Sequence, residues 1–400
     1  MSVDATPHRM NPQERRASVA LASLFALRML GLFLVLPVFA LEAAHYPGGD
    51  NAAKVGLALG VYGLMQALLQ IPLGAASDRF GRKRVIALGL LVFAVGSVLA
   101  ATATTLDGLL LGRAVQGAGA ISAAISALLA DLTRPVVRTK GMALVGISIA
   151  ASFALSLLLA PALTHAIGLS GIFVVTAVLA VLGVATILWV VPSEPQRHQA
   201  PDTAANLAAV LRSPQLLRLD WGVFALHAVQ VAMWLGVPTL LEHAGLARAV
   251  HWHVYLPALL GSVLLLGGVL FRLERKGHMK GVMVFSIALL LLVQLGLAWA
   301  ALTQAGVVAL GVLLFAFFLA FNALEASQPS LASKMAEPAQ RGSALGVFNT
   351  AQSLGVFVGG AAGGVLLQRG GAGLLYGVCA AVLLIWLVVV RGLDLRLAQH

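Results

Sequence analysis

Long apolar runs separated by short polar segments constrain this 400-residue chain more than any other feature. Because a membrane-spanning helix needs about 20 consecutive apolar residues, the runs predict twelve spans. They cover residues 17–44, 52–76, 85–104, 106–130, 141–166, 170–191, 221–241, 252–271, 282–302, 306–326, 344–367 and 374–390. With 60% hydrophobic and only 10% charged residues, the sequence predicts an all-α membrane protein and leaves no room for a large soluble domain.

The basic residues are distributed unevenly between alternate loops. With the N-terminus in the cytoplasm, 21 of the 26 Lys and Arg residues fall on that side, 3 on the other and 2 at membrane depth. Because basic loops stay cytoplasmic, we expect a multi-pass protein of a bacterial inner membrane with both termini in the cytoplasm. The net charge of +11 then reflects topology and contact with anionic lipids, and a nucleic-acid partner is not expected.

The chain carries a weak internal repeat. Residues 128–138 and 331–341 share Leu, Pro and Arg at the same spacing, 203 positions apart. We therefore expect an N-terminal six-helix bundle over 17–192 and a C-terminal one over 219–390. A cytoplasmic linker, 193–218, would join them, with cytoplasmic tails at 1–16 and 391–400. This is the layout of a secondary transporter with a site near the midplane.

The loop between the second and third spans reads Gly74-Ala-Ala-Ser-Asp78-Arg79-Phe-Gly81-Arg82-Lys-Arg. Gly74 would let another helix approach closely, and an anion such as Asp78 is favoured at a helix N-terminus. The segment resembles the signature loop G-x-x-x-D-R-x-G-R-[RK] of the major facilitator superfamily. That resemblance implies two pseudo-symmetric six-helix bundles, with Gly74, Asp78, Arg79, Gly81 and Arg82 forming a latch when the cytoplasmic side closes. Alternatively, the basic residues only set the topology.

Two arginines lie within predicted spans, where a charge is costly and normally faces protein or water. Arg113 and Gln116 share one face of the fourth span, in a run that resembles the R-x-x-Q-G motif of drug:proton antiporters. Arg113 would steer proton release or bind an anionic group, or else tie its helix to carbonyls of the first span. Arg28 is the second such cation, in the first span.

Four further runs, 27–31, 226–227, 254–256 and 321–326, look like those of the YajR group of proton-driven efflux transporters. The resemblance extends over nearly the whole chain. It implies antiport of small amphipathic compounds, multidrug substrates included, with the proton gradient in place of a cofactor. Members of that group can carry a soluble C-terminal domain. We do not expect one here, because the chain stops ten residues past the last span.

Glu325 is the carboxylate that the sequence places well inside a span, so we expect it to carry the proton. A buried acid near a cavity cation can gain and lose a proton as access alternates. Alternatively, Glu325 forms a permanent ion pair. His227 could share the proton, or simply satisfy a neighbouring group. The expected substrate cavity, between the first, fourth, seventh and tenth spans, is lined by Arg28, Arg113, Gln116, Gln230, Trp234 and Asn322.

Other functions remain open at this stage. Arg28 and Arg113 could hold an anionic metabolite or sugar in an importer or uniporter, with Glu325 structural, or the chain could be a membrane receptor. We expect no enzyme, because the sequence contains no nucleotide-binding loop or hydrolase motif. His243, His251 and His253 do not match zinc spacing, and the single cysteine, Cys379, excludes an internal disulfide. We expect a monomer that binds a small molecule, protons and lipid.

Overall fold

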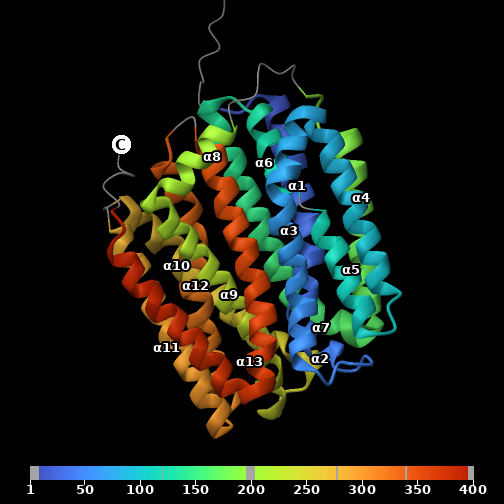
Figure 1. The fold of residues 1–400 in the computed structure, drawn as a ribbon, viewed down its shortest axis with the longest axis vertical. Coiled ribbons are helices and arrows are strands. Elements are labelled where there is room, and N and C mark those ends of the chain that lie inside the picture. The colour runs from blue at the N-terminus through green and yellow to red at the C-terminus, as the bar shows by residue number, and fades with distance from the viewer. Residues whose placement is uncertain (1–8, 120, 195–202, 276–277, 338–339, 395–400) are drawn as a thin grey trace, which may run out of the picture.

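The structure, a computed structural model, describes residues 9–119, 121–194, 203–275, 278–337 and 340–394. Within these residues the regular structure is helical, and the long helices run side by side (Figure 1). Ten helices are long and apolar enough to cross a membrane. We call the end of the bundle where α1 begins the upper face and the end where α2 lies the lower face, as drawn in Figure 1.

The first half of the chain forms one group of helices and the second half another. The first group contains α1 (Pro12–Val35), α2 (Phe39–Ala43), α3 (Ala52–Phe80), α4 (Arg82–Ala101), α5 (Leu106–Ala118), α6 (Ser122–Asp131), α7 (Pro135–Ala185) and the π-helix η1 (Thr186–Val190). The second contains α8 (Thr203–Arg212), α9 (Pro214–His243), the 3-10 helix η2 (Arg248–Val250), α10 (Trp252–Arg275), α11 (Met279–Thr303), α12 (Val307–Met335) and α13 (Arg341–Arg391).

Two of the long helices, α7 and α13, each extend over 51 residues and contain a reversal. The reversals fall at Gly168 and Gly371, whose φ angles of 66° and 65° suit glycine. Both ends of α13 consequently lie beside the start of α9, since Ala344 packs with Leu216 and the Asp394 amide donates to Gln215. Each of the two helices thus contributes two crossings, which confirms twelve spans.

Other predicted spans differ in their boundaries. The first is broken at Pro37, whose ring removes a backbone donor from the helix. The fourth is interrupted at Gly119, where α5 ends against α4. α9 begins at Pro214, before the predicted 221, because Ser213 caps it and proline suits the first turn. That polar first turn lies in the segment that the sequence assigned to the linker.

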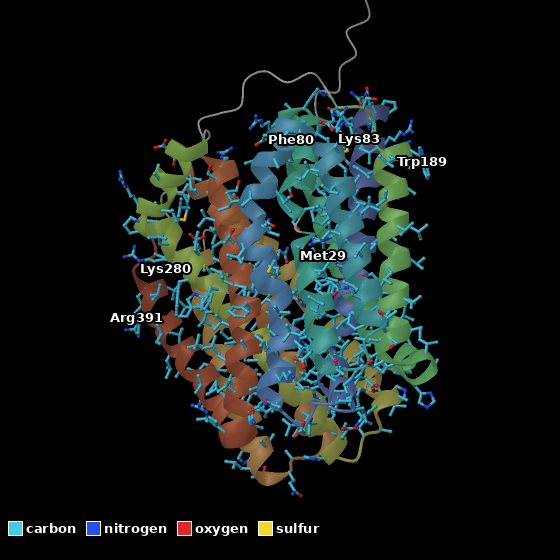
Figure 2. The ribbon with its side chains drawn as sticks, turned by 45° about the vertical axis from the view of Figure 1, so that its right-hand side comes forward. Met29, Phe80, Lys83, Trp189, Lys280 and Arg391 are labelled. Atoms are coloured by element: carbon cyan, nitrogen blue, oxygen red, sulfur yellow. The ribbon has the colours of Figure 1, made fainter. Side chains whose placement is uncertain are left out.

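The exposed surface of the bundle is apolar. Leu264, Val308 and Trp189 are 81%, 82% and 76% exposed, and Figure 2 shows Trp189 projecting outward from the first group of helices. Exposed apolar residues over so much of the surface would aggregate in water but are solvated by lipid. The chain is therefore a multi-pass membrane protein.

The two halves meet along the lower parts of α3 and α13. Gly56 and Gly60 of α3 lie against Gly360 and Gly364 of α13, and Gly63 lies against the backbone of Ser353 and Phe357; we call these five glycines the glycine seam. A Cβ atom at Gly56 would lie only 2.2 Å from the Gly360 carbonyl oxygen. The two backbones are therefore in direct contact, which only small residues allow.

The same two helices separate toward the upper face. Gly346, on α13 above the seam, would place a Cβ with nothing within 4 Å, and Gly74 of α3 has only Ala123 of its own half nearby. The described halves are thus closed against each other below and apart above.

The seam predicts the effect of a single methyl group. In Gly360→Ala, the new Cβ would lie 2.6 Å from the Gly56 carbonyl oxygen, and such overpacking costs about 1–3 kcal/mol. We expect the lower face to open. Spin labels at exposed Thr104 and Thr303, introduced as cysteines with Cys379→Ser, would report longer distances by pulsed EPR. Gly346→Ala on the same helix should leave the distances unchanged, and equal distances in both variants would contradict the closure.

Candidate functional site

A polar cluster joins three helices of the second half at mid-depth. Nε2 of His227 on α9 lies 3.5 Å from Oε2 of Glu325 on α12. The same Nε2 lies 2.7 Å from Nε2 of Gln352 on α13. The side chain of His227 is 7% exposed, whereas that of Glu325 is 41% exposed. The histidine is thus enclosed by protein while the carboxylate keeps an open side.

The cluster faces the first half. Phe318, two turns below Glu325 on α12, has its ring 6.0 Å from that of Phe153 on α7. Val231, one turn below His227, packs in a core formed mainly by the first half. Since residues seven or four apart share a helix face, Glu325 and His227 point toward the first half just above the level where the halves touch.

Hydrogen bonding defines the protonation of His227. Its Nδ1 lies 3.0 Å from the Val223 carbonyl oxygen, which can only accept, so Nδ1 carries hydrogen. Nε2 then accepts from the Gln352 amide, and the ring is neutral in this arrangement. A second proton would add at Nε2, within reach of the Glu325 carboxylate.

The two intramembrane arginines lie on either side of Tyr62 of α3. Arg28 donates to the Tyr62 hydroxyl and to Ser122, both at 2.8 Å. The Arg113 guanidinium lies 5.0 Å from the centre of the Tyr62 ring and donates to Gln116 at 2.9 Å. The two arginines are 1% and 3% exposed. In the described part of the chain, neither pairs with a carboxylate.

The expected site residues therefore fall into three places. Glu325 and His227 are brought together, and Glu325 pairs with this histidine rather than with an arginine. Arg28, Arg113 and Gln116 lie inside the first half, around Tyr62 and its neighbour Phe93. The remaining three lie in the second half: Trp234 packs edge-on against Tyr255, Asn322 donates to Ser262, and Gln230 is buried on α9.

The residues of the expected latch interact within the first half. Arg82 pairs with Asp78 at 2.9 Å and with Asp131 of α6 at 2.5 Å. Gly81, with φ 99°, allows the tight turn between α3 and α4. The exposed Arg79 stacks on Phe80 at 5.4 Å, at the upper end of the bundle (Figure 2). Gly74 packs near Ala123.

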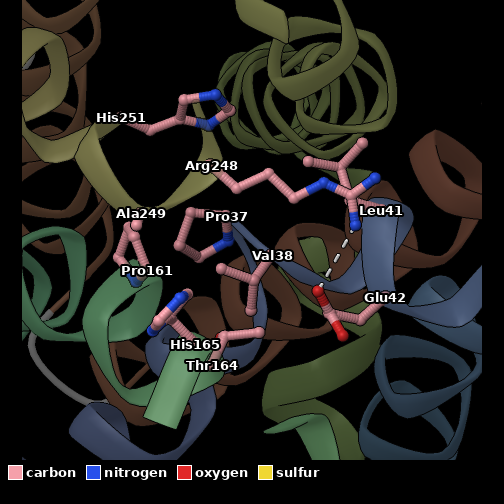
Figure 3. Close-up of a pocket in the computed structure, with 10 residues that line it drawn as sticks. All are labelled: Pro37, Val38, Leu41, Glu42, Pro161, Thr164, His165, Arg248, Ala249 and His251. Atoms are coloured by element: carbon pink, nitrogen blue, oxygen red, sulfur yellow. Dashed lines mark ion pairs between the residues drawn. The ribbon is translucent and has the colours of Figure 1, made fainter. Parts of the chain in front are cut away.

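A second ion-pair group at the lower face was not expected from the sequence. Arg248 pairs with Glu42 of the first half, at 3.6 Å, and with Glu242 of the second. Figure 3 shows the Arg248–Glu42 pair beside a pocket of about 100 Å³ between the halves. The sequence did place Arg248 and both glutamates on one side of the membrane, but it could not tell which of them meet.

Three other polar residues were also missed. Gln352 and Tyr62 are uncharged, so the search for intramembrane charges passed over them. Asp220 is 8% exposed, and its Oδ2 has no hydrogen-bond partner among the described residues. It lies near the start of α9, just after the predicted linker 193–218 and one residue before the predicted span 221–241.

Comparisons with known proteins agree with this architecture. Residues 21–360 match the sequence profile of the Major Facilitator Superfamily. The inner membrane transport protein YajR of Escherichia coli K12 is 43% identical over 363 residues, covering 89% of this chain and 78% of that protein. The multidrug resistance protein MdtH of Aeromonas salmonicida is 30% identical, covering 87% and 86%.

Solved structures show the same fold at low identity. The nucleoside transporter NupG matches with a TM-score of 0.72 at 17% identity, covering 95% of this chain and 98% of that one. An inward-facing bacterial homologue of the lysosomal transporter Spinster matches with a TM-score of 0.70 at 15% identity, covering 96% of each. The two-halved helical fold around a central polar cluster is that of a secondary membrane transporter. The chain belongs to the Major Facilitator Superfamily.

The lower-face ion pairs predict a measurable effect on closure. Removing the charge in Arg248→Gln breaks the bridge to Glu42, and exposed pairs contribute about 0.2–1 kcal/mol. We expect the lower-open population to rise by up to about fivefold, measured by pulsed EPR between positions 104 and 303. Lys54→Gln is the control, because Lys54 pairs with Asp107 inside the first half. An equal response of both variants would show that Arg248 does not hold the halves together.

Proposed function

We propose that this transporter exports small amphipathic compounds in exchange for protons, by alternating access. The observation that carries the proposal is the His227–Glu325 pair at 3.5 Å, on helix faces turned toward the first half. An intramembrane carboxylate is costly unless it is used or neutralised. Here its partner can itself gain or lose a proton.

The chemistry of the pair suits exchange. With His227 neutral, Glu325 is a partly exposed carboxylate that can receive a proton from the open side. With one proton shared between the two side chains, the pair has no net charge and needs less solvation by water. The halves can then close over it. An amphipathic cation entering the same space would favour the deprotonated carboxylate, and competition between it and the proton couples the two fluxes.

The relatives support the direction of transport. MdtH of Aeromonas salmonicida is named a multidrug resistance protein and YajR an inner membrane transport protein. We place the present chain in a bacterial inner membrane with the upper face cytoplasmic. This orientation puts Lys54, Arg248 and Arg369 at the opposite face, in keeping with the excess of basic residues on the cytoplasmic side. The described conformation is then open to the cytoplasm.

The latch fits the other half of the cycle. With the upper face open, Asp78 is held by Arg82 inside its own half. Closure would bring the upper part of α13 toward Gly74 and Asp78, where the carboxylate can meet the positive end of a helix.

A second candidate is import or uniport of an anionic metabolite or sugar. It is favoured by the two buried guanidinium groups of Arg28 and Arg113, which no described carboxylate neutralises. Both point into the first half in this conformation, so an anion could reach them only after that half rearranges. Flux of candidate anions into right-side-out vesicles would distinguish this function from export.

Neutralising Glu325 tests the coupling. We expect Glu325→Gln to reduce proton-driven uptake of amphipathic drugs into inside-out vesicles to the level of vesicles lacking the protein. Exchange of the same drugs without a gradient should persist, because the substitution keeps the size of the side chain. Glu337→Gln, beyond the end of α12, is the exposed control. Full proton-driven uptake by Glu325→Gln at every pH would exclude the assignment.

The latch is tested by Asp78→Asn. Loss of the charge removes its attraction to a helix N-terminus, worth about 0.3–1 kcal/mol when exposed. We expect the closed state of the upper face to become less populated, and a cysteine at Gly346 to react faster with a membrane-impermeant thiol reagent. Unchanged reactivity would leave Asp78 with a role confined to its own half.

A further inference from the structure

Gln352 connects the titrating pair to the helix that closes the lower face. Its amide donates to Nε2 of His227 at 2.7 Å, from α13 to α9. We propose that Gln352 is a positioning residue that transmits protonation of the His227–Glu325 pair to α13, and thereby to the glycine seam. The inference rests on the proposed proton coupling, and adds to it the route from the proton to the conformational change.

Proton binding changes which helices are joined. Nε2 accepts the Gln352 hydrogen bond only while it is unprotonated. Once Nε2 carries hydrogen, two N–H groups face each other at hydrogen-bond distance, and this contact becomes repulsive. The amide could restore it only by turning its oxygen to His227. The Glu325 carboxylate, 3.5 Å away, is the stronger acceptor because its hydrogen bond to an imidazolium is charge-assisted. Protonation therefore breaks the α9–α13 bond and strengthens an α9–α12 bond.

Gln352 is rigidly connected to the seam. The carbonyl oxygen of the next residue, Ser353, would lie 2.5 Å from a Cβ at Gly63. Gly360 follows eight residues later, about 12 Å along the same helix. Since the seam consists of backbone in contact with backbone, no flexible side chain can absorb a shift of α13. A small displacement at Gln352 must reach the seam.

The helix also has a surface on which it can move. Gly355 and Gly359 of α13 place its backbone against the carbonyl groups of Phe224 and Ala228 on α9. This contact lacks interlocking side chains on the α13 side. The Gln352–His227 hydrogen bond is therefore a specific restraint where the first arm of α13, before Gly371, meets α9 through Gly355 and Gly359.

The other charged or titratable groups on the surrounding helices lie farther away. On each of the three helices of the cluster, the nearest described charged residue is at least seven positions along the chain. It is seven positions from His227, nine from Glu325 and eleven from Gln352. Those are Asp220 on α9, Lys334 on α12 and Arg341 on α13. The neighbouring helices carry Lys54, Tyr62, Asp78 and Arg79 on α3, Arg138, Lys140 and His165 on α7, and His253 and Tyr255 on α10. Tyr62 and Tyr255 are turned toward Arg28 and Trp234. The pair itself is therefore the titrating centre next to Gln352.

The test uses protons as the only ligand. The full chain, spin-labelled at positions 104 and 303, is placed in nanodiscs and titrated between about pH 5 and about pH 9. We expect the parent to show a pH-dependent lower-open population. Gln352→Leu should retain less than about a third of this amplitude, because the α13 restraint no longer depends on protonation. Ser353→Ala is the matched control, since the Ser353 hydroxyl donates to Asn349 of its own helix and does not contact His227.

A second variant separates positioning from packing. In Gln352→Glu, a carboxylate against Nε2 favours the protonated ring, so the midpoint of the response should move up by about one pH unit or more. This shift reports the contact between residue 352 and Nε2, and the amplitude in Gln352→Leu reports the transmission to α13. The parent amplitude in Gln352→Leu, or an unshifted midpoint in Gln352→Glu, would overturn the inference.

The same titration distinguishes this inference from the proposed function. If Glu325→Gln loses the pH response while Gln352→Leu keeps it, proton coupling stands and the route through Gln352 is wrong. If the parent itself shows no pH response, both are wrong.

Discussion

Direct backbone contact between α3 and α13 is the interaction on which the rest of this structure depends. Because Gly56 and Gly60 meet Gly360 and Gly364, and Gly63 meets the carbonyl group of Ser353, the two halves approach closely at the lower face. The same helices are separated at Gly346 and Gly74. The bundle is thus closed at one end only, and the polar cluster of His227, Glu325 and Gln352 lies where the closed part stops.

The buried charges are solvated by different means in the two halves. Arg28 and Arg113 are held by hydroxyl, amide and aromatic groups around Tyr62. These groups are uncharged, so they do not neutralise the positive charge of the two arginines. Glu325 is held by a histidine, His227, and the change of charge in the second half belongs to the proposed coupling. Conformational change requires a group whose interactions differ between states, and we propose the His227–Glu325 pair as that group.

Much of the fold could be predicted from the sequence. Apolar length and the placement of basic residues predicted twelve spans, because lipid requires helices of a minimum length. The predicted boundaries were wrong where hydropathy was given more weight than a local signal. Pro37 and Gly119 break predicted spans, and the polar turn at Pro214 belongs to α9. Among the site residues, charge within a span pointed to Glu325, Arg28 and Arg113, whereas uncharged Gln352 carried no comparable signal.

The sequence alone determined that this chain crosses a membrane repeatedly, and which of its charges lie at membrane depth. These are properties of single helices against lipid, so hydropathy and spacing suffice. Only the tertiary structure decided that Glu325 meets His227, that the arginines turn toward Tyr62 and that Arg248 reaches Glu42. Such contacts depend on how each helix is rotated and on which helices are neighbours. Both are set by close packing between residues distant in the chain, which a local pattern does not encode.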